Sequence, residues 1–347
     1  MLEIEFHNRE KEIHEVMRIL NSRPDLITFV YGPINSGKSS LMDEVVKKLP
    51  DDYVVFFIDL RAHVVTSIDE FYDILFSYEI GLKRKITKFS DVISSLLSST
   101  VKFYSGFPLP ENLVSKVLKK DKPKNAFTYI FNILHELKSK GKIPVIILDE
   151  LQVIGDLKIN GLLIYELFNF FVTISKRFHL AHVFAITSDS LFIEKVFNEA
   201  MLHGRCRYLL VDDFDYNTTK EFLEKHGFNQ DEINLIWNYF GGKPVYLVEA
   251  IKNKDRLKDF CEKLVRLRRR QIKDSLYSLN VDFRKSVLKL LSNFKDRDFL
   301  TYDYLTEELR WCIKNNILFL DPLNDIVKPQ SQLDLLAIRE VLKRITS

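Results

Sequence analysis

The stretch that decides the fold is Leu26-Ile27-Thr28-Phe29-Val30-Tyr31-Gly32-Pro33-Ile34-Asn35-Ser36-Gly37-Lys38-Ser39-Ser40. It is an apolar run that enters a turn marked by two glycines, and it fits the pattern G-x-x-x-x-G-K-[ST] of a phosphate-binding loop. In such a loop Gly32 and Gly37 let backbone N–H groups point at phosphate oxygens, Lys38 reaches the terminal phosphates, and the Ser39 hydroxyl can hold Mg²⁺. We therefore expect residues 32–40 to bind a nucleotide.

The residues on either side of this loop distinguish the motif from a chance match. A β-branched, apolar run precedes it, and the apolar residues after it recur with helical spacing at Leu41, Met42, Val45, Val46 and Leu49. The anion would then lie at a helix N-terminus, where the helix dipole favours negative charge. Strand, glycine loop and helix together predict an α/β nucleotide-binding domain.

A second apolar run, residues 143–148, ends in two acids, Asp149 and Glu150. At the carboxyl end of a central parallel strand Asp149 would face the phosphates and hold Mg²⁺ through water, and Glu150 could polarise the attacking water. Such an ending is weak evidence alone, because solvated acids also lie at strand ends. Together with the upstream loop it predicts a Walker B strand.

Two polar segments leave alternatives open. Thr187-Ser188-Asp189 follows another apolar run, and its hydroxyls could sense a γ-phosphate or orient water, or the segment could cap the next helix. Asn8 could cap a helix whose apolar stripe begins at Ile13, or it could belong to a nucleotide pocket. The preference of helix caps for asparagine favours capping.

Length and composition restrict the class of protein. With 347 residues the chain exceeds the usual size of one core, so two or three domains are expected. A net charge of +3 implies no general polyanion-binding surface. The spacing of the three cysteines, Cys206, Cys261 and Cys312, fits neither a disulfide framework nor a zinc site. The first residues include the acids Glu3 and Glu5 and do not resemble a signal peptide. We expect a soluble, intracellular, cytoplasmic protein.

The remaining segments suggest the domain layout. Residues 83–125 lose the regular pattern, and such an insertion is either functional or mobile. From Val211 onward the pattern predicts a small helical bundle, then a hairpin at residues 317–329 and a closing helix, which together suggest a winged helix. The run Arg266-Leu267-Arg268-Arg269-Arg270 could contact nucleic acid, but an exposed charged helix face is the commoner explanation.

At this point the chain resembles a known family, the archaeal ATPases of the AAA+ class, close to the STAND signalling ATPases and similar in layout to the origin-recognition initiators. Besides the phosphate loop, the segments that carry the resemblance are Phe6-His7-Asn8-Arg9-Glu10-Lys11-Glu12-Ile13, Leu148-Asp149-Glu150-Leu151-Gln152, Thr187-Ser188-Asp189, His203-Gly204-Arg205, Gly241-Gly242-Lys243-Pro244-Val245-Tyr246-Leu247 and the terminal wing. The phosphate loop is specific only to the superfamily, whereas the Asn-Arg-Glu start and Gly-Gly-x-Pro narrow the match.

The resemblance implies a five-stranded parallel sheet in the order 5-1-4-3-2, a helical lid and a winged-helix domain, with boundaries at 1–211, 212–280 and 281–347. By the same analogy Asn8 and Arg9 would line the base and ribose pocket, Ser188 would be the sensor, Pro244 would pack on the adenine, and Arg205 would lie near the γ-phosphate. Typical AAA+ machines carry a lid arginine where this chain has Gly241 to Pro244, as STAND proteins do. That departure favours a nucleotide-controlled switch over a ring-shaped unfoldase.

The sequence therefore predicts a slow, Mg²⁺-dependent ATPase that acts as a molecular switch. In this hypothesis Ser39 and Asp149 hold the metal, Glu150 activates water, and Ser188 and Arg205 read the γ-phosphate. One alternative is a DNA-binding initiator or regulator whose DNA affinity is set by ATP, although its expected reading helix, residues 301–315, carries acids that face phosphate poorly. Another is a protein-interaction module that uses residues 83–125. No membrane contact is expected.

Overall fold

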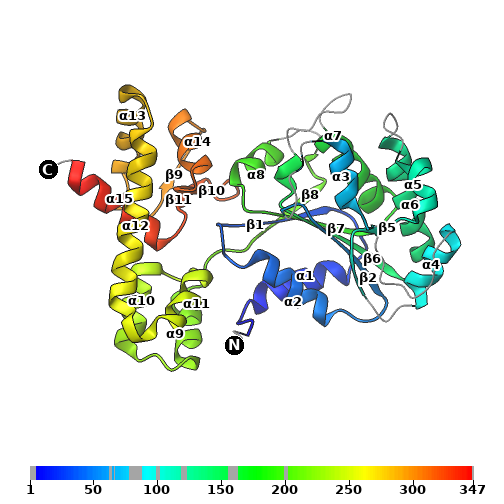
Figure 1. Ribbon diagram of the computed structural model, residues 1–347, viewed down its shortest axis with the longest axis horizontal. Helices are drawn as coiled ribbons and strands as arrows, with labels where there is room; N and C mark the ends of the chain where they lie inside the picture. The colour runs from blue at the N-terminus through cyan, green and yellow to red at the C-terminus, as the bar shows by residue number, and fades with distance from the viewer. Residues whose placement is uncertain are drawn as a thin grey trace.

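A parallel β-sheet of six strands lies at the centre of the amino-terminal part of the computed structural model (Figure 1). The structure describes residues 5–61, 65, 67–77, 88–98, 102–118, 123–154, 163–198 and 202–345. Across the sheet the order is β4-β2-β6-β7-β1-β8. The strands are β1 (Ile27–Tyr31), β2 (Tyr53–Asp59), β4 (Phe103–Ser105), β6 (Ile143–Asp149), β7 (His182–Thr187) and β8 (Cys206–Leu210).

The expectation of five strands is wrong by one. The sixth strand, β4, pairs with the outer edge of β2, with Val55 opposite Phe103. It comes from residues 83–125, which were expected to be irregular. Instead, the described parts of that segment form α4 (Phe89–Ser98), β4, β5 (Phe107–Pro108) and α5 (Glu111–Val117), while residues 83–87, 99–101 and 119–122 lie outside the described residues. The apolar side chains of Val92, Leu96 and Phe107 contribute to the main core.

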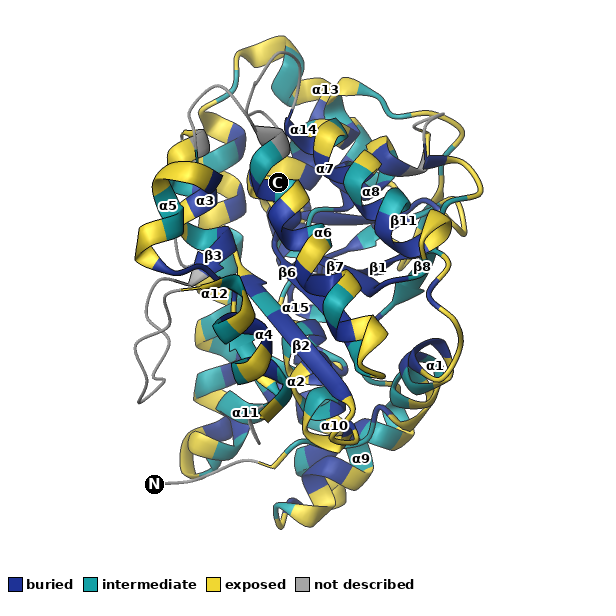
Figure 2. Ribbon diagram, turned by 90° about the vertical axis from the view of Figure 1, so that its right-hand side faces the viewer, coloured by how far each residue is buried: buried dark blue, intermediate teal, exposed yellow. Residues whose placement is uncertain are grey.

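Helices cover both faces of the sheet because its strands are apolar on both sides. Successive residues of β1 point to opposite faces, so Phe29 joins one core cluster and Val30 joins the other. One face packs against α1 (Glu10–Leu20) and α2 (Lys38–Lys48). The other face packs against α3 (Ile68–Leu75), α6 (Pro123–Ser139), α7 (Leu163–Val172) and α8 (Ser190–Phe197). Figure 2 shows the buried strands beneath these helices, whose exposed sides face outward.

A helical lid follows the sheet. It consists of α9 (Tyr216–Lys225), α10 (Gln230–Phe240) and α11 (Pro244–Lys252), with its own apolar core. Asp215 caps α9 by accepting a hydrogen bond from the Thr218 amide. Proline at the first position of α11 suits the helix start because its missing N–H would have no partner there.

The carboxyl-terminal part combines helices with a small antiparallel sheet of order β10-β11-β9. Its elements are α13 (Val281–Ser292), β9 (Leu300–Thr301), α14 (Glu307–Lys314), β10 (Leu318–Asp321), β11 (Ile326–Pro329) and α15 (Gln332–Ile345). The helix expected over residues 301–315 is shorter, because Thr306 caps α14 and residues 300–301 form a strand. The expected hairpin is present as β10 and β11.

One helix belongs to both of the last two parts. α12 (Leu257–Tyr277) contributes Leu257 and Cys261 to the lid core and Ile272 and Leu276 to the carboxyl-terminal core. Figure 1 shows it running along the side of the molecule from the lid to α13. Among the described helices, none is long and apolar enough to cross a bilayer.

Candidate functional site

The glycine loop between β1 and α2 has the backbone shape that its sequence requires. At Gly32 a side chain could not fit, because a Cβ atom there would lie 2.1 Å from the carbonyl oxygen of Val211. Gly37 has φ +93° and stands at the N-cap of α2, where it supplies no capping side chain. The first-turn amides of α2 therefore remain available for an anion.

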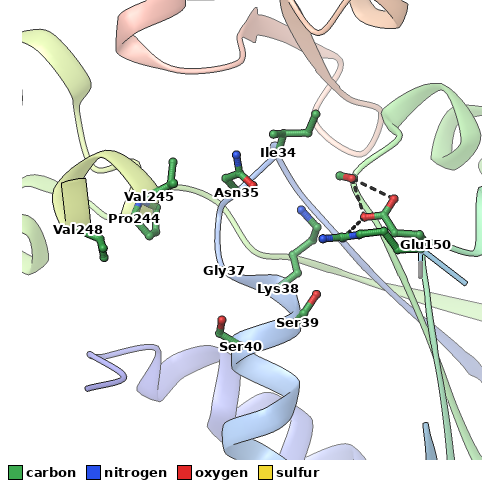
Figure 3. A pocket seen from close by; sticks show the side chains of 12 residues that line it. Ile34, Asn35, Gly37, Lys38, Ser39, Ser40, Glu150, Pro244, Val245 and Val248 are labelled. Carbon is green, nitrogen blue, oxygen red and sulfur yellow. Dashed lines mark hydrogen bonds and ion pairs between the residues drawn. The ribbon is translucent and has the colours of Figure 1, made fainter. Parts of the chain in front are cut away.

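Lys38 lies buried against this loop. Its Nζ donates to the carbonyl oxygens of Gly32 at 3.1 Å and Pro33 at 2.8 Å. Burial lowers the pKa of Lys38 to about 8, and the nearby carboxylate of Glu150 partly offsets that effect. In Figure 3 the side chain points into the space between the loop and Glu150. The ammonium group is thus placed for the terminal phosphates of a nucleotide.

Ser39 and Asp149 meet at the carboxyl edge of the sheet. The Ser39 hydroxyl donates to Asp149 Oδ2 at 2.7 Å. Asp149 is only 4% exposed, burial raises its pKa, and its Oδ1 is buried without a hydrogen-bond partner. A hydroxyl and a carboxylate are the hard oxygen ligands that Mg²⁺ prefers, so this pair fits the metal that the sequence motif implies.

Glu150 is held rigidly beside that pair. Its backbone has φ +61°, which turns the chain sharply at the end of β6, and its side chain is 7% exposed. The Ser188 hydroxyl donates to Oε1 at 2.9 Å, and the Arg61 guanidinium and the Gln152 amide also donate to the carboxylate. Sequence reasoning missed Arg61, because no motif or periodicity links it to Glu150, and it assigned no role to Gln152, although that residue lies in the same motif.

For Thr187 to Asp189 the sequence left open a role at the phosphate site or a helix cap. In the structure the three residues differ in what they contact. Asp189 caps α8 by accepting hydrogen bonds from the Leu191 and Phe192 amides. The Thr187 hydroxyl donates to Gln152 Oε1 at 2.7 Å. Ser188 alone turns toward the site, where it contacts Glu150 and the cavity described next.

A cavity of about 590 Å³ lies in front of the loop. Ile34, Asn35 and residues 37–40 form one wall, Arg61, Glu150 and Ser188 form another, and the lid closes it with Pro244, Val245 and Val248. Figure 3 shows these lid residues on one side of the loop and Glu150 on the other. The cavity thus offers polar groups at the loop and an apolar wall at the lid, which matches a nucleotide with its phosphates and base.

The lid is fixed to the loop by Lys243, which is 3% exposed. Its Nζ donates to the Ile34 carbonyl oxygen at 3.0 Å and lies 2.9 Å from Asp213 Oδ1. Gly242 is needed beside it, because a Cβ atom there would lie 1.8 Å from the Phe214 carbonyl oxygen. The Gly-Gly-Lys-Pro motif thus builds the contact between lid and loop.

The structure does not place Asn8 and Arg9 among the residues that line the cavity. Asn8 donates to Thr218 Oγ1 at 3.0 Å, so it connects the chain start to the lid. Arg9 lies behind the loop and donates to the carbonyl oxygens of Ser36 at 2.7 Å and Asp212 at 2.6 Å. The expected helix cap at Asn8 is also wrong: the N-cap of α1 is Arg9, with φ 72° and no capping hydrogen bond.

Within this chain Arg205 lies at the opposite edge of the sheet from the phosphate loop, away from the γ-phosphate position that the resemblance implied. Its carbonyl oxygen accepts a hydrogen bond from the Ile27 amide, at the start of β1, whereas the loop follows the end of that strand. Five strand residues at about 3.3 Å each separate the two edges. Arg207, on the same strand end, pairs with Asp25.

The carboxyl-terminal part also contacts the loop. Gln330 Oε1 accepts from the Ile34 amide at 3.2 Å, and the buried Tyr31 hydroxyl donates to Asp321 Oδ1 at 2.8 Å. Lys328 pairs with Asp212. A second cavity of about 320 Å³ lies between Glu150 and this part. We call the contacts of Gln330, Asp321 and Lys328 the latch.

The strand, the glycine loop, the helix behind it and the acidic end of β6 define a nucleotide-binding domain of the P-loop class. Residues 6–250 match the family described as an ATPase domain predominantly from Archaea, and residues 258–342 match the C-terminal domain of the uncharacterized ATP-binding protein MJ1010-like family. The chain belongs to this archaeal, AAA+-like ATPase family.

Full-length relatives support the assignment. An uncharacterized ATP-binding protein of Pyrococcus abyssi is 50% identical, covering 97% of this chain and 98% of the relative, and one of Methanocaldococcus jannaschii is 49% identical, covering 99% and 98%. Among solved structures, a Walker-type ATPase of P. abyssi has a TM-score of 0.62 at 17% identity, covering 96% of each chain. The ORC2 protein of Aeropyrum pernix has a TM-score of 0.51 at 11% identity, covering 100% and 97%. These likenesses show the fold.

Proposed function

We propose that the protein is a Mg²⁺-dependent ATPase whose nucleotide state sets the arrangement of the sheet domain, the lid and the carboxyl-terminal part. The observation that carries this proposal is the Ser39–Asp149 hydrogen bond, which lies beside Lys38 and Glu150 at the cavity. Relatives of nearly the same length are named ATP-binding proteins, which supports ATP as the nucleotide.

Each residue has one task in this mechanism. Lys38 exchanges its two loop carbonyls for phosphate oxygens, and the first-turn amides of α2 bind the remaining oxygens. Ser39 and Asp149 hold Mg²⁺, which when bound neutralises charge that develops on the phosphates. Glu150 exchanges one of its present donors for the attacking water and accepts its proton, while Ser188 keeps the carboxylate oriented.

The domain layout in this proposal follows the sequence boundaries: a sheet domain over residues 1–211, a lid over 212–280 and a winged helix over 281–347. Support for the winged helix comes from the order of α13, α14, the β10–β11 hairpin and α15 around one core. Because α12 belongs to two cores, the lid and the winged helix move together.

The switch proposal rests on the latch. Gln330 binds the backbone of the phosphate loop itself, Asp321 binds Tyr31 just before that loop, and Lys328 binds Asp212, which follows β8. When a nucleotide with a γ-phosphate is bound, Lys38 and Glu150 would exchange their present partners, and both residues lie next to these contacts. The latch is then weakened, and the winged helix is released from the sheet domain.

Calorimetric titration of nucleotide-free protein with Mg-ATP tests the binding site. Lys38→Ala should lose most of the affinity, because no other side-chain cation in the described cavity wall lies on the loop. Lys140→Ala, at the exposed end of α6, serves as the matched control and should bind as the wild type does. Wild-type affinity in Lys38→Ala would exclude this loop as the ATP site.

Glu150→Gln tests the chemistry separately from binding. The amide keeps the size of the side chain but cannot accept a proton, so hydrolysis should fall by about 10²- to 10⁴-fold while Mg-ATP still binds. Glu136→Gln, on the outer side of α6, is the control and should hydrolyse ATP at the wild-type rate. Undiminished phosphate release by Glu150→Gln would remove Glu150 from the catalytic role.

The two alternative functions were DNA binding through residues 301–315 and protein interaction through residues 83–125. Neither gains support from the described residues of these segments. Asp303 and the first-turn acids Glu307 and Glu308 face the region where a winged helix would meet DNA through α14, and they repel phosphate. The described side chains of residues 88–118 contribute apolar groups to the main core. This segment therefore has a structural role, which accounts for it without a separate interaction module.

A further inference from the structure

A third cavity, with distinctive chemistry, lies between α12 and α15 and shares no lining residue with the cavity at the phosphate loop. It has a volume of about 520 Å³, and we call it the basic groove. The cations that line it are Lys263, Arg266, Arg269, Arg270, Lys273 and Arg344. Figure 1 shows α12 and α15 at the opposite end of the molecule from β2 and β6.

The groove is a local concentration of positive charge. Six cations and one carboxylate, Asp274, give it a net charge of +5, whereas the whole chain carries +3, so the remainder of the protein sums to −2. Two ion pairs reduce this charge little. Arg270 lies 3.6 Å from Asp274 with both side chains largely exposed, and Arg269 lies 3.5 Å from Glu340. Such a concentration of charge attracts a polyanion.

The basic run read from the sequence divides into two sets of residues in the structure. Arg268 turns inward, where it pairs with Asp334 at 2.6 Å and donates to the Asn316 carbonyl oxygen. Arg266 and Arg270 face the groove and are exposed. The inward arginine therefore fixes α12 against α15, and the outward pair remains exposed, where it can meet a ligand.

The cations on α12 form a row. Lys263, Arg266, Arg270 and Lys273 follow helical spacing and so share one face of α12, which Tyr277 continues. At about 1.5 Å per residue the cations extend for about 15 Å. This length matches successive phosphates of an extended chain.

Two apolar groups lie within the row of charges. Tyr277 is 55% exposed and Leu267 is 47% exposed, and both line the groove. The Arg284 guanidinium lies 4.7 Å from the centroid of the Tyr277 ring, and Lys273 Nζ lies 5.6 Å from it. An exposed aromatic ring among cations provides a stacking surface next to phosphate-binding groups.

We propose that the basic groove binds single-stranded nucleic acid, with phosphates on the row of cations and a base stacked on Tyr277. Among polyanions only a single strand presents phosphates and unpaired bases together, because in a duplex the bases are stacked on one another. This proposal does not depend on the proposed ATPase function, since no residue of the ATP site lines the groove.

Fluorescence anisotropy with labelled 20-nucleotide dT and U oligomers tests the proposal on the full-length, nucleotide-free chain. Six phosphate contacts predict that log K falls with log salt with a slope of about −4, and Arg266→Gln/Arg270→Gln should reduce that slope by about 1.4 and weaken binding. The matched control is Lys138→Gln/Lys140→Gln, which removes the same charge at the exposed end of α6 and should leave both quantities unchanged. Equal losses in both double variants would overturn the assignment of the groove.

Tyr277 separates nucleic acid from other polyanions. Tyr277→Ala should weaken oligonucleotide binding by about 5- to 150-fold, the range expected for one stacked base, without changing the salt slope. Tyr277→Phe should restore binding, because it keeps the ring. If poly-glutamate competes as well as the oligomer does and Tyr277→Ala has no effect, the groove recognises charge alone and the proposal fails. Tighter binding to a duplex of the same length would also overturn it.

Discussion

Gly32 illustrates how a single residue links the phosphate loop to the rest of the fold. The Val211 carbonyl group, at the end of β8, occupies the space where any other residue would carry its side chain. The loop conformation thus depends on a strand nearly 180 residues away as well as on its own glycines. The glycine motif could be recognised in the sequence because its glycines determine the local backbone shape. The close approach of Val211 to Gly32 could not be predicted from the sequence.

The first prediction concerns Gly32→Ala. It should lower the thermal unfolding midpoint more than Gly141→Ala does, because both sites have positive φ but only Gly32 has a backbone atom within 4 Å of the new Cβ. Strain alone costs about 1–2 kcal/mol, and overpacking adds about 1–3 kcal/mol at Gly32. Differential scanning calorimetry measures both variants. Equal shifts would mean that Val211 moves aside at no cost.

His182 gives a prediction about acid stability. It is 3% exposed, and burial lowers its pKa to about 4 from an ordinary value of 6.5. The unfolded chain therefore binds more protons between pH 4 and 6.5, so stability from this residue is present above pH 6.5 and is lost as the pH falls toward 4. At pH 5 the loss should be about 2 kcal/mol. His182→Gln should lose less stability than the wild type between pH 7 and pH 5 in thermal melts, and identical losses would contradict this account.

At the scale of residues, the sequence identified site residues whose positions follow from local backbone motifs. It missed residues whose positions depend on tertiary packing. Lys38, Ser39, Asp149 and Glu150 follow directly from motifs at strand ends. Arg61 reaches Glu150 from a separate loop, and its position depends on how β2 and β6 lie side by side. No pattern in one sequence encodes that contact.

At the scale of elements, α11 connects the lid to the nucleotide loop. Lys243 sits just before it and pairs with Asp213, whose pKa burial raises. The sequence identified Gly-Gly-Lys-Pro as a family mark and assigned the adenine contact to Pro244. It did not identify Lys243, because buried lysines are uncommon and nothing in the pattern indicates burial.

Lys243→Ala should leave the partly buried Asp213 carboxylate without its cation, and the loss of stability should exceed that from breaking an exposed ion pair. The double variant Lys243→Ala/Asp213→Ala should recover part of the loss, because the unpaired carboxylate is then gone. Lys252→Ala serves as the control, since its pair with Glu249 is exposed and contributes at most about 1 kcal/mol. Thermal melts of the four proteins measure these differences, and equal midpoints for both single variants would contradict the role assigned to Lys243.

Elements with strong periodicity were predicted well, and weakly patterned ones were not. The apolar runs of β2, β6 and β7 and the stripe on α2 give clear signals because they are long and buried. The three-residue strand β4 has no such signal, since its pairing with β2 depends on the whole edge of the sheet. The helix expected at residues 301–315 is shortened by the Thr306 cap, which was not weighed against the longer apolar pattern.

At the scale of the whole molecule, the latch joins parts that are about 300 residues apart in sequence. Tyr31 and Asp321, and Ile34 and Gln330, form hydrogen bonds between the phosphate loop region and the small antiparallel sheet. Contacts of this kind arise only after each part has folded. They therefore could not be predicted from local sequence, although they determine what the proposed switch must break.

Removing the latch should open the molecule without nucleotide. In Lys328→Ala/Gln330→Ala the hydrodynamic radius should increase, because an ion pair to Asp212 and a hydrogen bond to the loop are lost. Gln271→Ala/Lys289→Ala, which changes the same residue types at exposed positions of α12 and α13, should keep the wild-type radius. Analytical ultracentrifugation measures both, and a latch variant as compact as the control would argue against the switch.

The matching nucleotide experiment uses Glu150→Gln. Because it should bind ATP without hydrolysing it, this variant with ATP should adopt the extended form, while the wild type with ADP should remain compact. The same sedimentation measurement distinguishes them. Slow hydrolysis without any change of shape would reject the switch and leave the ATPase proposal intact.

The continuous helix α12 also acts as a lever. Its 21 residues form a stiff rod of about 31 Å, anchored at one end in the lid and at the other in the carboxyl-terminal core. A lid rotation of only about 10° would sweep the far end of that rod through about 5 Å, roughly one helical turn. A small displacement at Pro244 would therefore be magnified at Tyr277, at the end of α12 that lies away from the lid.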